Sequence, residues 1–195
     1  MIFATANRHK LEEVQAIMPE GITLQTPADY GITEDIPENE STLEGNALAK
    51  ARYVYLATGE DCFADDTGLE VDALGGEPGV RSARYAQGAG HDSRANMELL
   101  LKNLSGGDNR RARFRTVIAL ILKGKEHLFE GIVEGSIRHE GSGSEGFGYD
   151  PIFEPTGYTT TFAEMPLEEK NLISHRSICT RKLINFLTHR AENGL

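Results

Sequence analysis

The 195-residue chain has few cysteines and no long apolar run. Its two cysteines, Cys62 and Cys179, lie far apart in the sequence, and we expect both to be free buried thiols in a reducing, cytoplasmic compartment. A membrane-spanning helix needs about 18 consecutive apolar residues, and the sequence offers no such run. The apolar start at residues 1–4 is too short for the core of a signal peptide. We therefore expect neither a membrane partner nor a secretion signal.

Positive charge is also scarce, because 20 Lys and Arg residues face 30 Asp and Glu residues, for a formal net charge of -10. A nucleic-acid binder normally has a basic face, so this balance argues against that class of protein. It allows a small phosphorylated ligand, since a few cations and a divalent metal can serve one pocket. The length and the ordinary apolar content, 39%, suit one domain or two small lobes around a real core.

The spacing of apolar residues predicts alternating strands and helices. Residues 113–123 and 126–137 read as an antiparallel hairpin that turns at Gly124-Lys125. Ser41 and Glu44 have the spacing of a capping box at the start of a long helix. The pattern indicates an α/β protein with a mixed sheet and two lobes, with a cleft lined by loops. The remaining predicted strands cover residues 2–6, 22–24 and 61–64, and the predicted helices cover residues 10–18, 42–57, 93–104 and 174–187.

Residues 4–10, Ala-Thr-Ala-Asn-Arg-His-Lys, join the first predicted strand to the first predicted helix. The free N–H groups at a helix start attract anions, and Thr5, Asn7 and Lys10 add polar contacts and charge. No G-x-x-x-x-G-K-[ST] motif occurs in the chain, so this segment is not the standard P-loop. The alternative interpretation is that Asn7 only caps the helix while Arg8 and Lys10 are solvated.

Two adjacent carboxylates, Asp65 and Asp66, follow an apolar strand and precede Thr67 and Gly68. Carboxylates beside an apolar segment are costly unless cations pair with them, and Mg²⁺ prefers oxygen ligands. We predict a metal-binding turn at this position. The alternative is a plain turn in which one Asp bonds the backbone and Gly68 supplies a positive φ. The D-x-D-x-[TV] motif of aspartyl-phosphate phosphatases does not fit adjacent Asp residues.

A glycine-rich stretch, residues 141–148, leads into Phe147-Gly148-Tyr149-Asp150-Pro151. Aromatic rings beside a flexible backbone suit stacking on a base, and Asp150 can accept a hydrogen bond from a base N–H. The alternative is a turn before a short strand, with Phe147 in the core.

Further along the chain, Ser174 is the predicted N-cap of the last helix. His175 and Arg176 then occupy its first turn. A cation there opposes the helix dipole, so Arg176 is misplaced unless an anion or acceptor lies nearby. This favours a ligand-binding interpretation about as much as a structural one, whereas His175 alone would more often be structural.

Taken together and in this order, these motifs resemble the inosine triphosphate pyrophosphatase family, and they span almost the whole chain. The matches are T-x-N-x-x-K at Thr5, Asn7 and Lys10, the acidic block at residues 64–74, G-x-P-G-x-x-S-A-R-Y at residues 76–85, F-G-Y-D-P at residues 147–151 and S-H-R at residues 174–176.

The resemblance implies a single domain over residues 1–195, with an elongated mixed sheet and flanking helices that form two lobes around a central cleft. It implies Mg²⁺-dependent hydrolysis of ITP, dITP and XTP to the monophosphate and pyrophosphate, in a homodimer. Asp66 corresponds to the catalytic residue, and Asp66 with Asp65 to the metal site. The substrate-binding residues that it implies are Thr5, Ala6, Asn7, Arg8, His9, Lys10, Thr67, Phe147, Gly148, Tyr149, Asp150, Lys170, His175 and Arg176.

One position departs from the family pattern. The family often carries a metal-binding Glu directly before an Asn-Ala pair in the long helix, and this chain has Gly45 there. One helical position is a rotation of about 100°, so Glu44 cannot simply take over the role. Glu38 and Glu40 are further candidates.

The implied reaction is attack of water on the α-phosphorus. We expect Mg²⁺ held by Asp66, with or without Asp65, to offset the developing charge, and a carboxylate to orient or deprotonate the water. The division of roles between the two Asp residues stays open.

The predicted site also suggests how the base is selected. His175 or Arg176 can donate a hydrogen bond to the 6-oxo group of hypoxanthine, which adenine lacks. Discrimination against GTP has to come from the 2-position, and the sequence does not show how.

Two other functions fit parts of the sequence. A Maf-type pyrophosphatase of modified pyrimidine nucleotides shares the general architecture, but the F-G-Y-D and S-H-R blocks argue against it. A nucleotide-binding regulator without catalysis is the second alternative, and Gly45 is its only support. The apolar stretch Leu99-Leu100-Leu101 fits either the core or a dimer interface.

Overall fold

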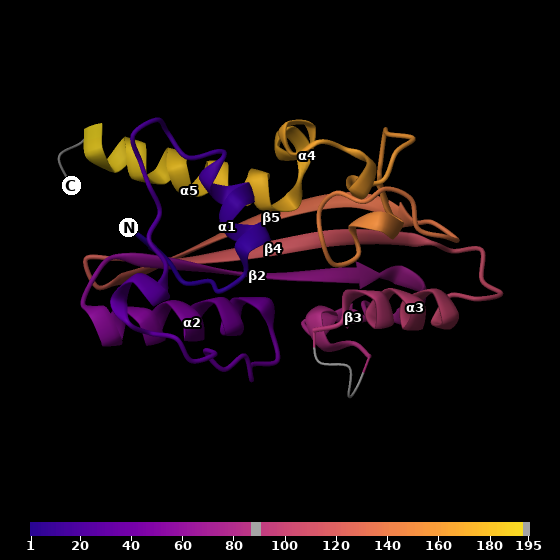
Figure 1. Cartoon of the computed structure of the whole chain (residues 1–195), viewed down its shortest axis with the longest axis horizontal. Coiled ribbons are helices and arrows are strands. Elements are labelled where there is room, and N and C mark those ends of the chain that lie inside the picture. The colour runs from indigo at the N-terminus through magenta and orange to yellow at the C-terminus, as the bar shows by residue number, and fades with distance from the viewer. Residues whose placement is uncertain (87–90, 193–195) are drawn as a thin grey trace. The chain divides into compact units, whose positions relative to one another are not determined.

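The computed structural model describes residues 1–86 and 91–192, which form a mixed α/β fold (Figure 1). The sheet has the strand order β1-β2-β4-β5-β6, with β3 paired to β2. The pair β1–β2 is parallel while β2–β3 and β5–β6 are antiparallel, so the predicted mixed sheet is confirmed. The strands are β1 (Ile2–Phe3), β2 (Cys62–Val71), β3 (Pro78–Gly79), β4 (Arg111–Leu122), β5 (Lys125–Ile137) and β6 (Phe153–Pro155), and the helices are α1 (Arg8–Gln15), α2 (Leu43–Thr58), α3 (Ser93–Asn103), α4 (Leu167–Ile173) and α5 (His175–Glu192).

The chain separates into two compact units. The first comprises Met1–Asp66, Thr116–Gly131 and Arg176–Leu195, and the second comprises Thr67–Arg115 and Ile132–His175. The strands β2, β4 and β5 each contribute residues to both units. Within the described residues, no helix is long and apolar enough to cross a membrane.

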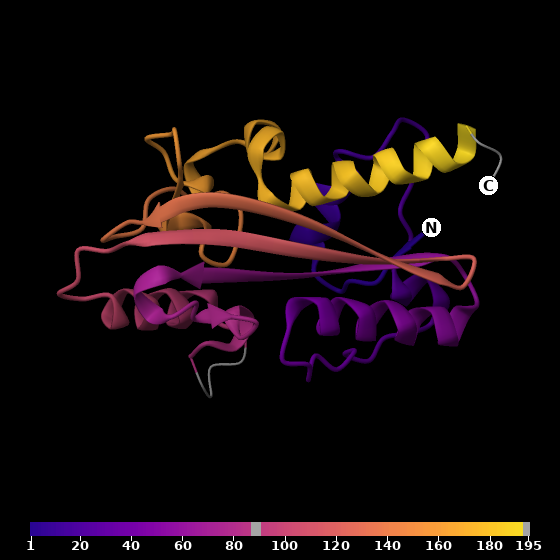
Figure 2. The ribbon, with the colours of Figure 1, turned by 180° about the vertical axis from the view of Figure 1, so that it is seen from behind.

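In the first unit, α1 and α5 cover one face of the sheet and α2 covers the other, as both views of the ribbon show (Figures 1 and 2). The core between sheet and α5 contains Phe3, which stacks on Phe63 with ring centroids 4.6 Å apart. Cys179 and Cys62 are buried free thiols, as predicted. Burial raises the pKa of both thiols to about 12, so they stay protonated at neutral pH.

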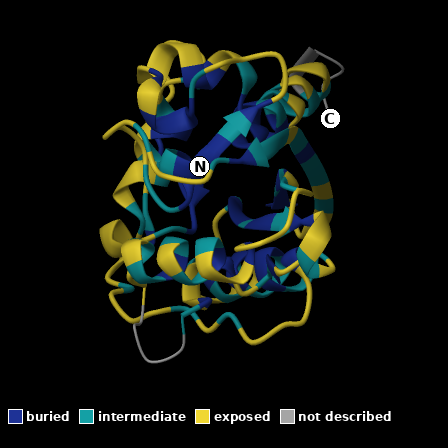
Figure 3. Ribbon diagram, turned by 90° about the vertical axis from the view of Figure 1, so that its right-hand side faces the viewer, coloured by how far each residue is buried: buried dark blue, intermediate teal, exposed yellow. Residues whose placement is uncertain are grey.

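The second unit has its own core, around Phe114, Phe153 and Phe162. Leu100 is fully buried in it, and Leu99 and Leu101 are partly buried and pack against the same cluster. The stretch that fitted either core or interface therefore packs in the core. Figure 3 shows the buried residues concentrated in the strands and the exposed residues on the outward sides of the helices.

The long hairpin β4–β5 is confirmed, and its two-residue turn lies one position before the predicted one. Lys123 and Gly124 both have positive φ, 50° and 75°. This is the conformation of a two-residue type I′ turn, whose twist matches that of the flanking strands.

Two local predictions were wrong, and one helix was missed. Residues 22–24 do not form a strand, and the only pairing described beside them is an isolated bridge between Gln25 and Ile2. The N-cap of α2 is Thr42 instead of Ser41, because the Thr42 hydroxyl accepts the N–H of Gly45 at 3.0 Å. The helix α4 was not predicted, because residues 167–173 are too short for a clear apolar period.

Gly68 lies inside β2 and not in a turn, so the alternative interpretation, in which it supplies a positive φ to a plain turn, is wrong. Its role is close approach, because a Cβ at this position would lie 2.6 Å from the carbonyl oxygen of Gly79 on β3. Only glycine lets the β3 backbone come this near.

We predict that Gly68→Ala destabilises the protein by about 1–3 kcal/mol, since the β2–β3 contact must open to admit the methyl group. Chemical denaturation with urea measures the free energy of unfolding. The matched control is Gly107→Ala, where a Cβ meets only the Leu104 carbonyl oxygen at 3.9 Å. Equal stability of the two variants would contradict the assignment.

Candidate functional site

The two adjacent carboxylates lie in the middle of β2 and not in the predicted turn. Asp65 is 1% exposed and Asp66 is 7% exposed. Successive side chains of a strand point to opposite faces of the sheet. The partners of the two carboxylates follow this rule, because Asp65 meets side chains from α1 and α5 whereas Asp66 meets side chains from α2.

Asp65 pairs with two cations. Its carboxylate accepts from Lys10 Nζ and from Arg176 Nε, each at 3.0 Å. Burial alone would raise the pKa of Asp65, but the two cations outweigh burial and hold the pKa well below its usual range. Asp65 is therefore an anion that binds α1 and α5 to the central strand.

Arg176 lies at the start of α5, where a cation opposes the helix dipole. The structure supplies the anions that the sequence required, because Arg176 Nη1 donates to Glu13 at 2.5 Å and Nε donates to Asp65. Arg176 is 1% exposed and Glu13 is 3% exposed. Burial would lower the pKa of Arg176, but Glu13 and Asp65 raise it above its ordinary value, so the guanidinium is charged.

Asp66 has a different environment. Its Oδ2 accepts from Asn46 Nδ2 at 3.0 Å, and its Oδ1 lies 3.9 Å from Lys50 Nζ. The net effect raises the pKa of Asp66, because burial and the nearby Glu38 carboxylate outweigh Lys50, Lys10 and Asn46. Asp66 is the more easily protonated of the two Asp residues, as a group that handles a proton requires.

Lys50 connects Asp66 to Glu38. Its ammonium contacts the Glu38 carboxylate in a very short ion pair, and it also donates to the Asp65 carbonyl oxygen at 2.7 Å. Burial would lower the pKa of Lys50, but Asp66 and Glu38 outweigh it and leave the pKa raised. A positive charge thus sits between two carboxylates, so this part of the molecule is built to hold a cation.

The contacts of Asp66 and Lys50 indicate which carboxylates could bind a metal ion. Among the described residues, no three His, Cys, Asp or Glu side chains are grouped as a ready metal site. Asp66 and Glu38 both lie near the Lys50 ammonium, and hard oxygen donors of this kind suit Mg²⁺. Asp65 faces the opposite side of the sheet, so its predicted share in the same metal ion conflicts with strand geometry.

The departure at Gly45 has a physical reason. A Cβ there would lie 2.7 Å from the Cβ of Glu40, so glycine lets the preceding loop lie directly on α2. Packing therefore accounts for Gly45, and this residue no longer supports the alternative of a nucleotide-binding regulator without catalysis. Glu44 is partly exposed in the first turn of α2 and is not part of the capping box that its spacing predicted.

The segment before α1 matches both earlier interpretations in part. Asn7 caps α1 by accepting the Lys10 N–H at 3.2 Å, and Thr5 Oγ1 accepts the Asn7 N–H at 3.1 Å. Ala6, Arg8 and His9 are exposed, and Arg8 pairs with Glu12. Lys10 is not simply solvated, because its ammonium binds Asp65 and burial lowers its pKa.

In the second unit, Asp150 and Lys170 form a buried ion pair at 2.7 Å. The same Asp150 oxygen accepts the Phe147 N–H at 2.9 Å, which closes the predicted loop. The Lys170 ammonium lies 5.3 Å from the Phe147 ring centroid and 5.6 Å from that of Phe162. Asp150, Lys170 and Phe147 are therefore brought together, and their predicted role in substrate binding stays a prediction.

Two more of the predicted substrate contacts in this unit, Tyr149 and His175, are buried in the protein. Tyr149 is 5% exposed, and its hydroxyl donates to the Ser82 carbonyl oxygen at 2.7 Å. His175 is 2% exposed and stacks on Phe114, with ring centroids 4.5 Å apart. Phe147, with Gly148 beside it, is only partly buried and is the ring better placed to stack on a base. Thr67, also partly buried, directly follows Asp66 in β2.

Sequence reasoning missed Glu13, Asn46 and Lys50. A signal for two of them was present, because Asn46 and Lys50 are one helical turn apart beside the apolar stripe of α2. Both are buried polar residues, at 2% and 7% exposure, and such residues need partners. Glu13 carried no such signal, since its partner lies 163 residues away.

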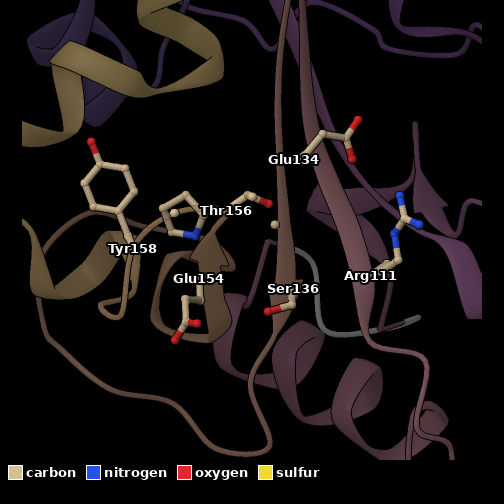
Figure 4. Close-up of a pocket in the computed structure, with 9 residues that line it drawn as sticks. Arg111, Glu134, Ser136, Glu154, Thr156 and Tyr158 are labelled. Atoms are coloured by element: carbon tan, nitrogen blue, oxygen red, sulfur yellow. The ribbon is translucent and has the colours of Figure 1, made fainter.

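A hollow of about 260 Å³ lies elsewhere in the second unit (Figure 4). Its lining includes Arg111, Glu134, Glu154 and Tyr158. None of the predicted site residues lines it, so it does not coincide with the chemistry described above.

The buried Arg176–Glu13 pair gives a direct prediction. Glu13→Gln removes one of the two anions that compensate Arg176 and should cost about 3 kcal/mol of stability. Thermal and urea unfolding measure the loss. The matched control is Glu12→Gln, whose partner Arg8 is exposed, and it should unfold like the parent protein. A Glu13→Gln protein as stable as this control would show that the buried pair contributes nothing.

Comparison with known proteins identifies the family to which the chain belongs. The model of the Ham1 family matches residues 1–186. A dITP/XTP pyrophosphatase of Flavobacterium johnsoniae is 52% identical over 188 residues, which are 96% of this chain and 97% of that protein. Two solved structures are similar along nearly their whole length. The Staphylococcus aureus Ham1 protein has a TM-score of 0.86, 36% identity and coverage of 97% of this chain and 98% of that one.

The second is a nucleoside-triphosphatase / dITP/XTP pyrophosphatase of Mycobacterium abscessus, with a TM-score of 0.75, 42% identity and coverage of 95% and 97%. These comparisons confirm the resemblance that the motifs predicted. The chain belongs to the Ham1 family.

Proposed function

We propose that the protein is a nucleoside triphosphate pyrophosphatase that removes non-standard purine nucleotides from the nucleotide pool. It converts ITP, dITP and XTP to the monophosphate and pyrophosphate. The observation that carries this proposal is the buried Asp66, with its raised pKa, held by Asn46 and Lys50 beside Glu38. The relatives named dITP/XTP pyrophosphatase support the substrate class.

In the proposed reaction, a water oxygen bonds to the α-phosphorus while the bond from that phosphorus to the bridging oxygen breaks. Pyrophosphate leaves, and the monophosphate keeps the water oxygen. Asp66 orients the attacking water and accepts its proton. The N-terminal end of α1, with its positive dipole end, and the Lys10 ammonium bind phosphate oxygens.

We propose Asp66 and Glu38 as the residues that hold Mg²⁺. When bound, the ion would neutralise charge on the phosphate oxygens. Lys50 already places a positive charge near both carboxylates, and this supports the proposal that they pair with a cation. Asp65 has the separate task of positioning Lys10 and Arg176.

The second unit carries groups that suit a purine base. The Phe147 ring can stack on it, and the buried Lys170 ammonium is a donor for a 6-oxo group. Adenine has an amino donor at that position, and this amino group cannot accept a hydrogen bond from Lys170. The donor role expected of Arg176 competes with its two carboxylate partners, Glu13 and Asp65, and stays a prediction.

Three further expectations stay predictions: a homodimer, a cytoplasmic location and the absence of a nucleic-acid partner. The net charge of -10 supports the last of these, and the two buried thiols suit a reducing compartment.

The proposed activity predicts a substrate order. Purified protein with Mg²⁺ should hydrolyse ITP, XTP and dITP at least about 100-fold more efficiently, by kcat/KM, than ATP or UTP. Chromatography of the products should show monophosphate and pyrophosphate in equal amounts, and turnover in ¹⁸O-water should label the monophosphate. Release of inorganic phosphate with a nucleoside diphosphate, or equal rates with ATP and ITP, would contradict the proposal.

The metal assignment predicts a difference between two neighbouring carboxylates. Glu38→Gln should raise the half-saturating Mg²⁺ concentration at least about tenfold, because a metal ligand loses its charge. Glu40→Gln is the control, since the contact of Glu40 with Asn46 uses its backbone N–H. Mg²⁺ titration of ITP hydrolysis after chelation with EDTA measures both. Equal half-saturating concentrations in the two variants would remove Glu38 from the metal site.

A further inference from the structure

The loop before α2 presents Glu38 to Asp66 without a core of its own. We call residues 33–41 the acidic strap, because they include Glu34, Asp35, Glu38 and Glu40. Every residue of the strap is exposed or only partly buried. Apolar packing therefore does not determine where the strap lies, and its contacts with α2 must.

Those contacts follow one face of α2. The Tyr53 hydroxyl donates to Glu34 Oε1 at 2.5 Å, Lys50 pairs with Glu38, and Asn46 Oδ1 accepts the Glu40 N–H at 3.0 Å. Helix positions 46, 50 and 53 are spaced by four and three residues, which puts them on the same side of the helix. The strap runs antiparallel to α2 along this line and lies close to it at Gly45, where a Cβ would be 2.7 Å from the Cβ of Glu40.

The three residues of α2 differ in whether they also contact Asp66. Asn46 and Lys50 also contact Asp66, so they belong to the candidate site itself. Tyr53 does not, since among the described residues its hydroxyl has Glu34 as its partner. The hydrogen bond from Tyr53 lowers the pKa of Glu34, so the carboxylate is ionised and the contact is charge-assisted.

We propose that the Tyr53–Glu34 contact is a remote anchor that holds the acidic strap on α2 and so keeps Glu38 beside Asp66. The inference rests on the proposed function for its assignment of Glu38 to the cation. Tyr53 is thereby a positioning residue, because it acts through the strap and touches no group of the site. Loss of the anchor lets the strap leave α2 in a fraction of molecules, and the cation then binds only the remainder.

The test replaces Tyr53 by Phe, which removes the hydroxyl and keeps the ring. Tyr55→Phe is the matched control, because Tyr55 lies on the same helix and its hydroxyl has no hydrogen bond within residues 1–86 and 91–192. Two readouts are taken. One is amide hydrogen exchange at Glu40 in metal-free protein, since that N–H is bonded to Asn46. The other is Mg²⁺ titration of ITP hydrolysis.

We expect Tyr53→Phe to speed exchange at Glu40 about three- to tenfold and to raise the half-saturating Mg²⁺ concentration by a similar factor, which is the usual effect of one such hydrogen bond. The kcat at saturating Mg²⁺ should stay within about twofold of the parent protein, because every site group is intact. Glu34→Ala should have the same effects, and combining it with Tyr53→Phe should add little.

Unchanged exchange at Glu40 in Tyr53→Phe would overturn the anchor, and so would faster exchange with unchanged Mg²⁺ dependence. Equal effects in Tyr55→Phe would also overturn it, because they would reflect any loss of a tyrosine hydroxyl from α2. Parent protein without turnover on any nucleoside triphosphate would instead contradict the proposed function. In that case calorimetric titration of Mg²⁺ into the parent protein and Tyr53→Phe decides the inference, and equal affinities would refute it.

Discussion

The alternation of side chains along β2 separates two buried carboxylates that are neighbours in sequence. The contacts of Asp65 place its side chain on the face covered by α1 and α5, and those of Asp66 place its side chain on the face covered by α2. Each needs compensation, since an unpaired buried charge is costly. Asp65 receives it in full from Lys10 and Arg176, which lowers its pKa, whereas Asp66 receives less and has a raised pKa. The same strand thus holds one carboxylate with a lowered pKa and one with a raised pKa, and the proposed catalytic role belongs to the second.

The compensation of these charges ties together distant parts of the chain. Arg176 connects Asp65 on β2 with Glu13 on α1, and Lys50 connects Asp66 with Glu38 on the loop before α2. These are all contacts of the first unit. The second unit has its own buried ion pair, Asp150–Lys170, set among the rings of Phe147 and Phe162. In both units, buried charges are matched with opposite charges and hydrogen bonds, as buried ionic groups must be.

The sequence predicted the elements with strong apolar periods, which include α2, α3, α5 and the β4–β5 hairpin. An element that buries one face has apolar residues at a regular spacing, and this spacing is visible in the sequence. The motifs also named several residues of the candidate site, among them Asp65, Asp66 and Arg176, and their roles stay predictions. It could not place Asp65 and Asp66 on opposite faces, because a dipeptide does not show whether it continues a strand or turns. Nor could it find the buried Glu13 or the ion pair between Glu38 and Lys50. Those assignments depend on which segments meet in space.

The separation of roles between Asp65 and Asp66 is the central claim, and a comparison of their Asn variants tests it most directly. Turnover of ITP at saturating Mg²⁺ and the free energy of unfolding are measured for both proteins. The account predicts that Asp66→Asn loses about 10²–10⁴-fold in kcat with near-normal stability, because a proton acceptor is lost. Asp65→Asn should lose about 3 kcal/mol of stability, because it leaves two buried cations short of an anion. Near-normal turnover by Asp66→Asn, or a fully stable Asp65→Asn, would contradict the account.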